Sequence, residues 1–265
     1  MLDPGFFERI LKELSSHALY LTFYFQGEPY LHPEFTNLVV IARKHRMYTA
    51  TSTNGHYLDD ERARLTVQSG LDRLIISIDG ASQATYEQYR VGGNLEKVLE
   101  GAKRMVDWKR RLNSPTPHII FQFLVVKPNE HELDQIHSLA RQIGVDEVVF
   151  KTAQVYDFEN GHPLIPDNAR YSRYEKQSDG KWHVKSKLEN HCWKMWQSCV
   201  ITWDGKVVPC CFDKDGQHVM GNLQQQSFKE IWNATTYKSF RTQLLKGRKD
   251  IDICRNCSEG TSVFE

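Results

Sequence analysis

The sequence predicts an α/β protein in which a parallel β-sheet or βα barrel precedes a small cysteine-bearing domain. Segments of strand type and helix type alternate through the first 155 residues, which is the pattern of parallel strands joined by crossover helices. All six cysteines lie after residue 191. We therefore expect a βα domain over residues 1–155, a connecting segment over 156–190 and a metal-binding domain over 191–265.

The βα alternation begins with a helix over residues 2–16, whose apolar residues recur at helical spacing behind Pro4. Strands are predicted at 19–26, 47–53, 73–78, 118–126 and 147–155, and helices at 33–45, 60–69, 94–112 and 129–143. Gly70, Gly144 and Asn94 are the expected helix-end residues. Because the series opens on a helix, a preceding strand and its loop are expected to be missing.

The remainder of the chain has fewer regular elements. Residues 156–190 are polar, with turns expected at sites such as Asp179-Gly180. A hairpin is predicted at Asp204-Gly205. The last helix is predicted to start at Ser227, in a capping-box sequence, and to continue as one apolar stripe to Leu244.

Charge and hydropathy exclude several classes of protein. Lys and Arg number 34 against 33 Asp and Glu, which argues against a bulk electrostatic grip on nucleic acid or an anionic membrane. Apolar runs such as residues 38–42 are too short to cross a bilayer, and Met1 is followed by no signal-peptide pattern. We expect a cytoplasmic protein.

Four cysteines have the spacing of a metal site. Cys254 and Cys257 form a CxxC pair, Cys192 precedes the predicted hairpin, and Cys210 lies on its return strand. Four thiolates suit either zinc or an iron–sulfur cluster, so spacing alone leaves the metal open. The other two cysteines, Cys199 and Cys211, are expected to be spare thiols. Three disulfides would be the alternative in a secreted protein.

Polar residues recur where the predicted strands end. They are Gly27-Glu28-Pro29, residues 52–55, residues 77–80, Gln122 and Lys151. Active sites of βα barrels lie at the carboxyl ends of the strands. Any one of these residues could be a solvated loop residue, but the set at successive strand ends favours a binding site.

The cysteine region resembles the auxiliary cluster site of SPASM and twitch domains, which follow radical S-adenosylmethionine (radical SAM) cores. The resemblance rests on Cys192-x12-Gly205-x4-Cys210 and Cys254-x2-Cys257. It implies one auxiliary 4Fe–4S cluster on these four cysteines, as in the one-cluster twitch version. A full SPASM domain holds two clusters and needs more cysteines than remain here.

Residues 1–155 resemble a radical SAM core, a partial (β/α)6 barrel that here lacks its first strand. Gln26-Gly27-Glu28-Pro29 is similar to the motif that holds the amino group of S-adenosylmethionine, with Gln26 in place of its usual first glycine. The resemblance further implies that the cofactor contacts the residues Ser52, Asn54, Ser77, Asp79 and Arg90. A surface salt bridge is the alternative for Arg90, and no catalytic acid or base is identified.

The family's CxxxCxxC motif, which binds the catalytic cluster, occurs nowhere in this sequence. Together with the missing first strand, this predicts a chain truncated at its N-terminus, with the catalytic 4Fe–4S cluster present only in a longer parent. A natural short form that has lost radical chemistry is the alternative.

The resemblance implies an oxidoreductase that cleaves S-adenosylmethionine to a 5′-deoxyadenosyl radical and modifies a peptide or small metabolite. It would take electrons from a donor such as a ferredoxin or flavodoxin. This chain alone is expected to be inactive. The alternative function is a non-catalytic module with one cluster or zinc, acting in electron transfer or as a structural element.

Overall fold

The computed structural model describes residues 1–260. The chain divides into two compact units. One, here called the sheet unit, comprises residues 17–155 and 161–172, and the other, the cysteine unit, comprises residues 1–16, 156–160 and 173–265. The units therefore divide the chain differently from the predicted domains, chiefly because the first 16 residues belong with the C-terminal part.

The sheet unit contains five parallel strands in sequential order, which confirms the predicted βα alternation. They are β1 (Tyr20–Thr22), β2 (Tyr48–Thr53), β3 (Arg73–Ser77), β4 (His118–Val125) and β5 (Glu147–Thr152). β1 is shorter than the strand predicted over 19–26. Beyond it, one further backbone bond joins Phe23 N–H to the Ala50 carbonyl, at 2.8 Å.

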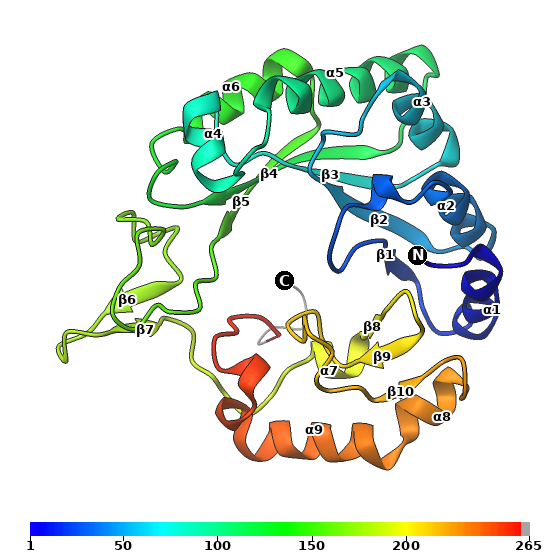
Figure 1. Cartoon of the computed structure of the whole chain (residues 1–265), viewed down its shortest axis with the longest axis vertical. Coiled ribbons are helices and arrows are strands. Elements are labelled where there is room, and N and C mark those ends of the chain that lie inside the picture. Colours follow the sequence, from blue (N-terminus) through cyan, green and yellow to red (C-terminus); the bar gives the residue numbers. More distant parts are fainter. Residues whose placement is uncertain (261–265) are drawn as a thin grey trace. The chain divides into compact units, whose positions relative to one another are not determined.

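Helices lie along one face of this sheet (Figure 1). They are α2 (Phe35–Lys44), α3 (Asp60–Ser69), α5 (Leu95–Arg111) and α6 (Leu133–Ile143). Alternate strand residues such as Leu74, Ile76, Phe121 and Phe123 form the core beneath them, because successive side chains of a strand point to opposite faces. The intervening strand positions therefore face away from these helices.

Local signals determine most helix ends in this unit. The Asn94 side chain accepts a hydrogen bond from Lys97 N–H, and Gly70 and Gly144 end their helices in the left-handed conformation. Two short elements were not predicted, η1 (Pro29–Leu31) and α4 (Gln83–Tyr89). α4 is capped by Ser82, whose hydroxyl accepts from Thr85 N–H, so a usable signal was present in a mostly polar segment.

The cysteine unit has one core, built on small sheets and short helices. Its elements are α1 (Pro4–Leu14), β6 (Tyr174–Lys176), β7 (Trp182–Val184), α7 (Lys194–Gln197), β8 (Val200–Ile201), β9 (Lys206–Val208), β10 (Gly221–Asn222), α8 (Phe228–Asn233), α9 (Thr235–Gly247), η2 (Arg248–Asp250) and η3 (Asp252–Cys254). β8 and β9 form the predicted hairpin, and Gly205 adopts a φ of 84° in its turn.

The single last helix predicted from Ser227 is wrong. The Ser227 capping box is present, but α8 ends at Asn233 and α9 begins at Thr235. Ala234 lies between them with an extended ψ of 156°. The apolar stripe nonetheless continues into both helices, because Ile231, Phe240 and Leu244 all enter the same core.

Helix α1 packs in the core of the cysteine unit. Ile10 is buried in its core, with Phe6 and Leu14 packed alongside. Arg9 donates to the Leu223 carbonyl at 3.2 Å, and Lys229 N–H donates to Glu13 at 3.1 Å. The apolar face predicted for this helix is therefore real, but its partner lies more than 180 residues away in the sequence.

In residues 1–260, no helix combines the length and apolar character needed to span a membrane.

Candidate functional site

Two regions carry the predicted site residues. The strand-end region consists of residues at or after the carboxyl ends of β1–β5, namely 26–28, 52–56, 77–82, 122–132 and Lys151, together with Arg90. The cysteine region consists of residues 190–211 and 248–260. The first belongs to the sheet unit and the second to the cysteine unit.

A row of polar side chains crosses the sheet on the face opposite the helices. Ser52 of β2 and Ser77 of β3 have their hydroxyl oxygens 3.4 Å apart. Ser77 is the register partner of Gln122 on β4, and registered residues of neighbouring strands share a face. The structure thus brings the predicted residues Ser52 and Ser77 together, with the predicted strand-end residue Gln122 next to Ser77.

The Glu28 carboxylate joins the loop after β1 to the end of β2. It accepts hydrogen bonds from Thr53 Oγ1 at 2.8 Å, Asn54 N–H at 2.8 Å and Tyr30 N–H at 3.1 Å. The preceding Gly27 has a φ of 83°, a left-handed conformation that favours glycine. Glu28 therefore fixes the shape of this loop in addition to any part in ligand binding.

Asp79 is buried at 1% exposure and both of its carboxylate oxygens are bonded. Oδ1 accepts from Leu124 N–H at 2.7 Å, and Oδ2 pairs with Arg90 Nε at 2.5 Å. Burial raises the pKa of Asp79, and the Arg90 charge and these hydrogen bonds oppose that rise. Arg90 is 32% exposed, so its guanidinium extends from a buried carboxylate toward solvent.

Two buried polar residues of this region were missed by the sequence analysis. The Asn129 amide donates to the carbonyls of Asp79 and Leu124 and accepts from Val126 N–H. Glu132 accepts from Ala81 N–H at 2.7 Å and from Ser82 Oγ at 3.2 Å. Pro128 directly before Asn129 marked a turn, but the distant partners could not be inferred from the chain order.

The other predicted residues of the region lie close by. The Asn54 side chain accepts from His56 N–H at 2.9 Å, which makes a local turn at the end of β2. Lys151 on β5 is exposed. Its register partner is Leu124, one strand away from the row of Ser52, Ser77 and Gln122.

Three of the four predicted metal ligands are buried. Cys192, Cys254 and Cys257 are exposed by only 6–7%, whereas Cys210 is partly exposed. The pKa of Cys254 is raised to about 12, mainly by burial; the charge of Arg248 opposes this rise, and the thiols of Cys257 and Cys192 add to it. The pKa of Cys210 is raised mainly by a hydrogen bond with Cys211 and by burial, and to a smaller extent by Cys257. Cys192 and Cys254 lie in the same core of the cysteine unit.

The thiols of the cysteine region form no disulfide in the part of the chain that is described. Residues 1–260 also contain no group of three Cys, His, Asp or Glu side chains that could hold a single metal ion. In a four-iron cluster each thiolate binds a different iron atom, so its ligands stand farther apart than those of one ion.

The surroundings of the thiols also fit a cluster. Gly260 has no side chain, and a Cβ at this position would collide with the Cys192 sulfur. The guanidinium of Arg248 opposes the burial-induced rise in the pKa of Cys254 and of Cys257. A cation beside buried thiols stabilises their thiolate form, which is the form that binds iron.

The two remaining cysteines differ from this set. Hydrogen bonding between the adjacent thiols of Cys210 and Cys211 lowers the pKa of Cys211 and raises that of Cys210. Cys211 is exposed. Burial raises the pKa of Cys199 to about 12, opposed by Arg241. Their interpretation as spare thiols remains a prediction.

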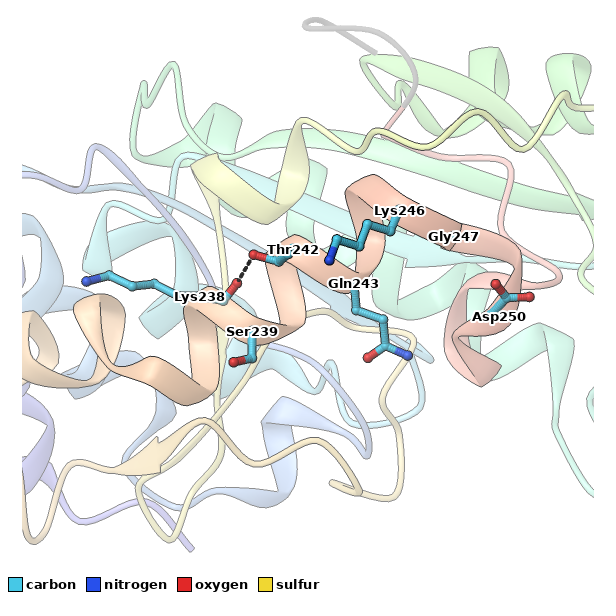
Figure 2. Close-up of a pocket in the computed structure, with 7 residues that line it drawn as sticks. All are labelled: Lys238, Ser239, Thr242, Gln243, Lys246, Gly247 and Asp250. Atoms are coloured by element: carbon cyan, nitrogen blue, oxygen red, sulfur yellow. Dashed lines mark hydrogen bonds between the residues drawn. The ribbon is translucent and has the colours of Figure 1, made fainter.

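A surface pocket along α9 holds none of the predicted site residues (Figure 2). It is lined by Lys238, Ser239, Thr242, Gln243, Lys246, Gly247 and Asp250. The Thr242 hydroxyl donates to the Lys238 carbonyl at 2.9 Å, within the helix itself. Apart from Asp250 of η2, these residues belong to the polar face of the amphipathic helix α9, whose other face, including Tyr237 and Leu244, is buried.

Two protein-family models match this chain, one over the part with the strand-end region and one over the part with the cysteine region. Residues 192–258 match the model of SPASM, an iron–sulfur cluster-binding domain, and residues 1–149 match that of the radical SAM superfamily. These two models imply S-adenosylmethionine and iron–sulfur clusters as cofactors.

Several individual proteins are similar along most of the chain. A tungsten-containing aldehyde ferredoxin oxidoreductase cofactor-modifying protein from Pyrococcus furiosus is 24% identical over 91% of this chain and 75% of its own. A PqqA peptide cyclase from Gluconobacter oxydans is 26% identical over 88% of this chain and 68% of its own.

Among solved structures, native anSMEcpe with bound AdoMet matches with a TM-score of 0.65. It is 17% identical to this chain, and the match covers 100% of this chain and 84% of that one. Because the sequence identity is low, this match shows that the two proteins share a fold and shows nothing about their function. Because the family model covers more than half of the sequence, this chain belongs to the radical SAM superfamily and carries a C-terminal SPASM domain.

Proposed function

We propose that this chain supplies the cofactor-binding barrel and the auxiliary cluster of a radical SAM enzyme that oxidises or otherwise modifies a peptide or small metabolite. The observation that carries the proposal is the row of Ser52, Ser77 and Gln122 on the sheet face opposite the helices. A polar row of this kind at strand ends is the usual place for a ligand in a parallel α/β sheet.

The strand-end region would hold S-adenosylmethionine through groups of different chemistry. Glu28 would accept from the amino group of the methionine moiety. Ser77 and Asn54 offer neutral hydrogen-bonding groups suited to a ribose. Arg90 uses Nε to hold Asp79, and its remaining N–H groups would bind the methionine carboxylate, as arginine does in forked pairs. Asp79 would act mainly by orienting Arg90.

Bound S-adenosylmethionine, reduced by a catalytic 4Fe–4S cluster, supplies a radical that removes a hydrogen atom from substrate. The sequence contains no CxxxCxxC motif, so ligands for that cluster would come from a longer form of the protein. In the cysteine region, Cys192, Cys210, Cys254 and Cys257 would hold the auxiliary cluster.

The substrate class follows from the similar proteins. One is a peptide cyclase and another modifies the cofactor of an oxidoreductase. Both a peptide and a small molecule are consistent with the polar row, beside which Lys151 is an exposed cation. A donor such as a ferredoxin or flavodoxin would supply electrons.

The test is binding of S-adenosylmethionine to the anaerobically reconstituted chain, measured by equilibrium dialysis. Ser77→Ala removes one hydroxyl from the row, and we expect the dissociation constant to rise about fivefold, which corresponds to one hydrogen bond. Ser239→Ala on α9 is the matched control and should leave binding unchanged. Failure of the unmodified chain to bind S-adenosylmethionine would contradict the proposed cofactor site.

A second function is favoured by the absence of CxxxCxxC from the sequence. In that case the chain would be an electron-transfer or structural module with one auxiliary cluster. About four iron and four sulfide per chain without binding of S-adenosylmethionine would favour this module. Zinc bound without sulfide would show that the chain has no auxiliary iron–sulfur cluster, which would contradict that part of both proposed functions.

A further inference from the structure

Arg248 is a completely buried arginine in the cysteine region. Its exposed fraction is 0%, and it is the largest fully buried side chain among residues 1–260. Arginine is almost never fully buried unless its charge is paired, because removing the charge from water is costly. Among residues 1–260, Arg248 donates hydrogen bonds to two backbone carbonyls and to the Asn190 side-chain oxygen, and to no carboxylate.

The hydrogen bonds of Arg248 connect the two cysteine-bearing segments. Nη1 donates to the His191 carbonyl at 2.8 Å, and Nη2 donates to the Glu259 carbonyl at 2.6 Å. His191 directly precedes Cys192, and Glu259 follows Cys257 by two residues. The Arg248 guanidinium therefore connects the segment just before Cys192 with the segment just after Cys257.

Nothing in residues 1–260 accepts a hydrogen bond from the Nε of Arg248, although this atom is buried. The guanidinium also interacts with the thiols of Cys254 and Cys257. A buried donor without an acceptor destabilises the folded protein. The cost and the location both indicate that an anionic group normally faces this side chain.

A thiolate-bound iron–sulfur cluster is such a group. The cluster with its four thiolates carries a net negative charge, and one-electron reduction adds a further negative charge. A buried cation attracts the reduced form more strongly than the oxidised form, and weak screening in the interior strengthens the difference. Hydrogen bonds to the cluster or cysteine sulfurs act in the same direction, since both charge and hydrogen bonding set the potential of such clusters.

We propose that Arg248 is a positioning residue that clamps the two cysteine segments together and, through its guanidinium N–H groups, raises the reduction potential of the cluster on Cys192, Cys210, Cys254 and Cys257. This inference rests on the auxiliary cluster proposed above. In this proposal one side chain both holds the ligand segments in place and contributes positive charge next to the cluster.

The test uses the full chain, reconstituted anaerobically, with iron and sulfide analysis followed by a potentiometric titration read by electron paramagnetic resonance. Arg248→Gln removes the charge. We expect the cluster to be retained and its equilibrium constant for one-electron reduction to fall at least tenfold, a shift of about 59 mV to lower potential. A purely structural residue would not shift the potential in this way.

Arg255→Gln is the matched control. Arg255 lies between Cys254 and Cys257 but is exposed, so water and salt screen its charge and the potential should stay at its unmodified value. Equal potentials in Arg248→Gln and Arg255→Gln would overturn the role of Arg248 and leave the cluster site standing.

Arg248→Lys decides the question if Arg248→Gln does not fold, as judged by circular dichroism. Lysine keeps the charge but has no Nε–H and cannot bind both carbonyls in a fork, so we expect a smaller fall in potential together with faster cluster loss. An unchanged potential and unchanged cluster lifetime in Arg248→Lys would overturn the proposal. An unmodified chain that binds neither iron nor sulfide would overturn the proposed cluster itself.

Discussion

The strand-end region and the cysteine region satisfy their buried polar groups in different ways. Glu28 and Asp79 are already bonded to backbone N–H groups and to neighbouring side chains. The cysteine region instead buries three thiols and an arginine Nε that has no acceptor among residues 1–260. The first region is therefore preorganised by the fold, whereas the second leaves a buried donor without an acceptor among the described residues.

The largest effect should follow from removing one thiol. We expect Cys257→Ala to reduce the iron content from about four per chain to nearly none, because an incomplete ligand set does not hold the cluster. Amide hydrogen exchange should accelerate in residues 248–260 and stay unchanged in β2–β4, since metal binding contributes folding free energy locally. Retention of full iron would contradict the ligand role of Cys257.

Cys199→Ala is the control for this experiment. Cys199 packs beside the same core but is not one of the four predicted ligands, so the variant should keep its iron. Loss of iron from Cys199→Ala would mean that the ligand set was assigned incorrectly.

A smaller effect is expected in the strand-end region from Asp79→Asn. The substitution removes the charge that pairs with Arg90, and Arg90 can still reach water because it is partly exposed. We expect a loss of about 2 kcal/mol in the free energy of unfolding, measured by urea denaturation. Iron content should not change, because the residue belongs to the other unit.

Asp167→Asn provides the comparison for Asp79. Asp167 pairs with Lys127 at 3.0 Å, but its side chain is 73% exposed. Such a pair contributes at most about 1 kcal/mol. A loss in Asp79→Asn no greater than in Asp167→Asn would show that the buried pair does not preorganise the strand ends.

The smallest effect on stability is expected from Glu28→Gln. The neutral amide keeps one oxygen acceptor, so the loop loses part of a three-bond arrangement and about 1 kcal/mol of unfolding free energy. The free energy of binding S-adenosylmethionine should fall by more than the free energy of unfolding, because the ligand's ammonium group loses a charged partner. If Glu28→Gln and the unmodified chain bind S-adenosylmethionine equally well in equilibrium dialysis, Glu28 stabilises its loop but does not bind the cofactor.

Much of the fold could be predicted because its signals are local. The strand and helix alternation, the cap at Asn94 and the capping box at Ser227 all depend on residues within a few positions of one another. The end of α8 at Asn233 could not be predicted in the same way. The apolar stripe runs through Ala234, and only the conformation of the chain there shows that two helices share the stripe.

The candidate sites were predictable in their residue types and less so in their partners. The spacing of Cys192, Cys210, Cys254 and Cys257 marked a metal site, but Arg248 carried no signal, because a single arginine in a charged segment is usually on the surface. Asn129 and Glu132 were missed for a related reason. Their partners at Asp79 and Ala81 lie about 50 residues away.

The sequence by itself determined the family, the order of the strands and helices, and the positions of the thiols and strand-end polar residues, because each depends on local spacing and residue type. Only the tertiary structure decided where α1 packs, which carboxylates are already bonded and that Arg248 is buried beside the thiols. Those properties depend on contacts between residues far apart in the chain, and a buried charge can be identified only when the residues that exclude water from it are in place.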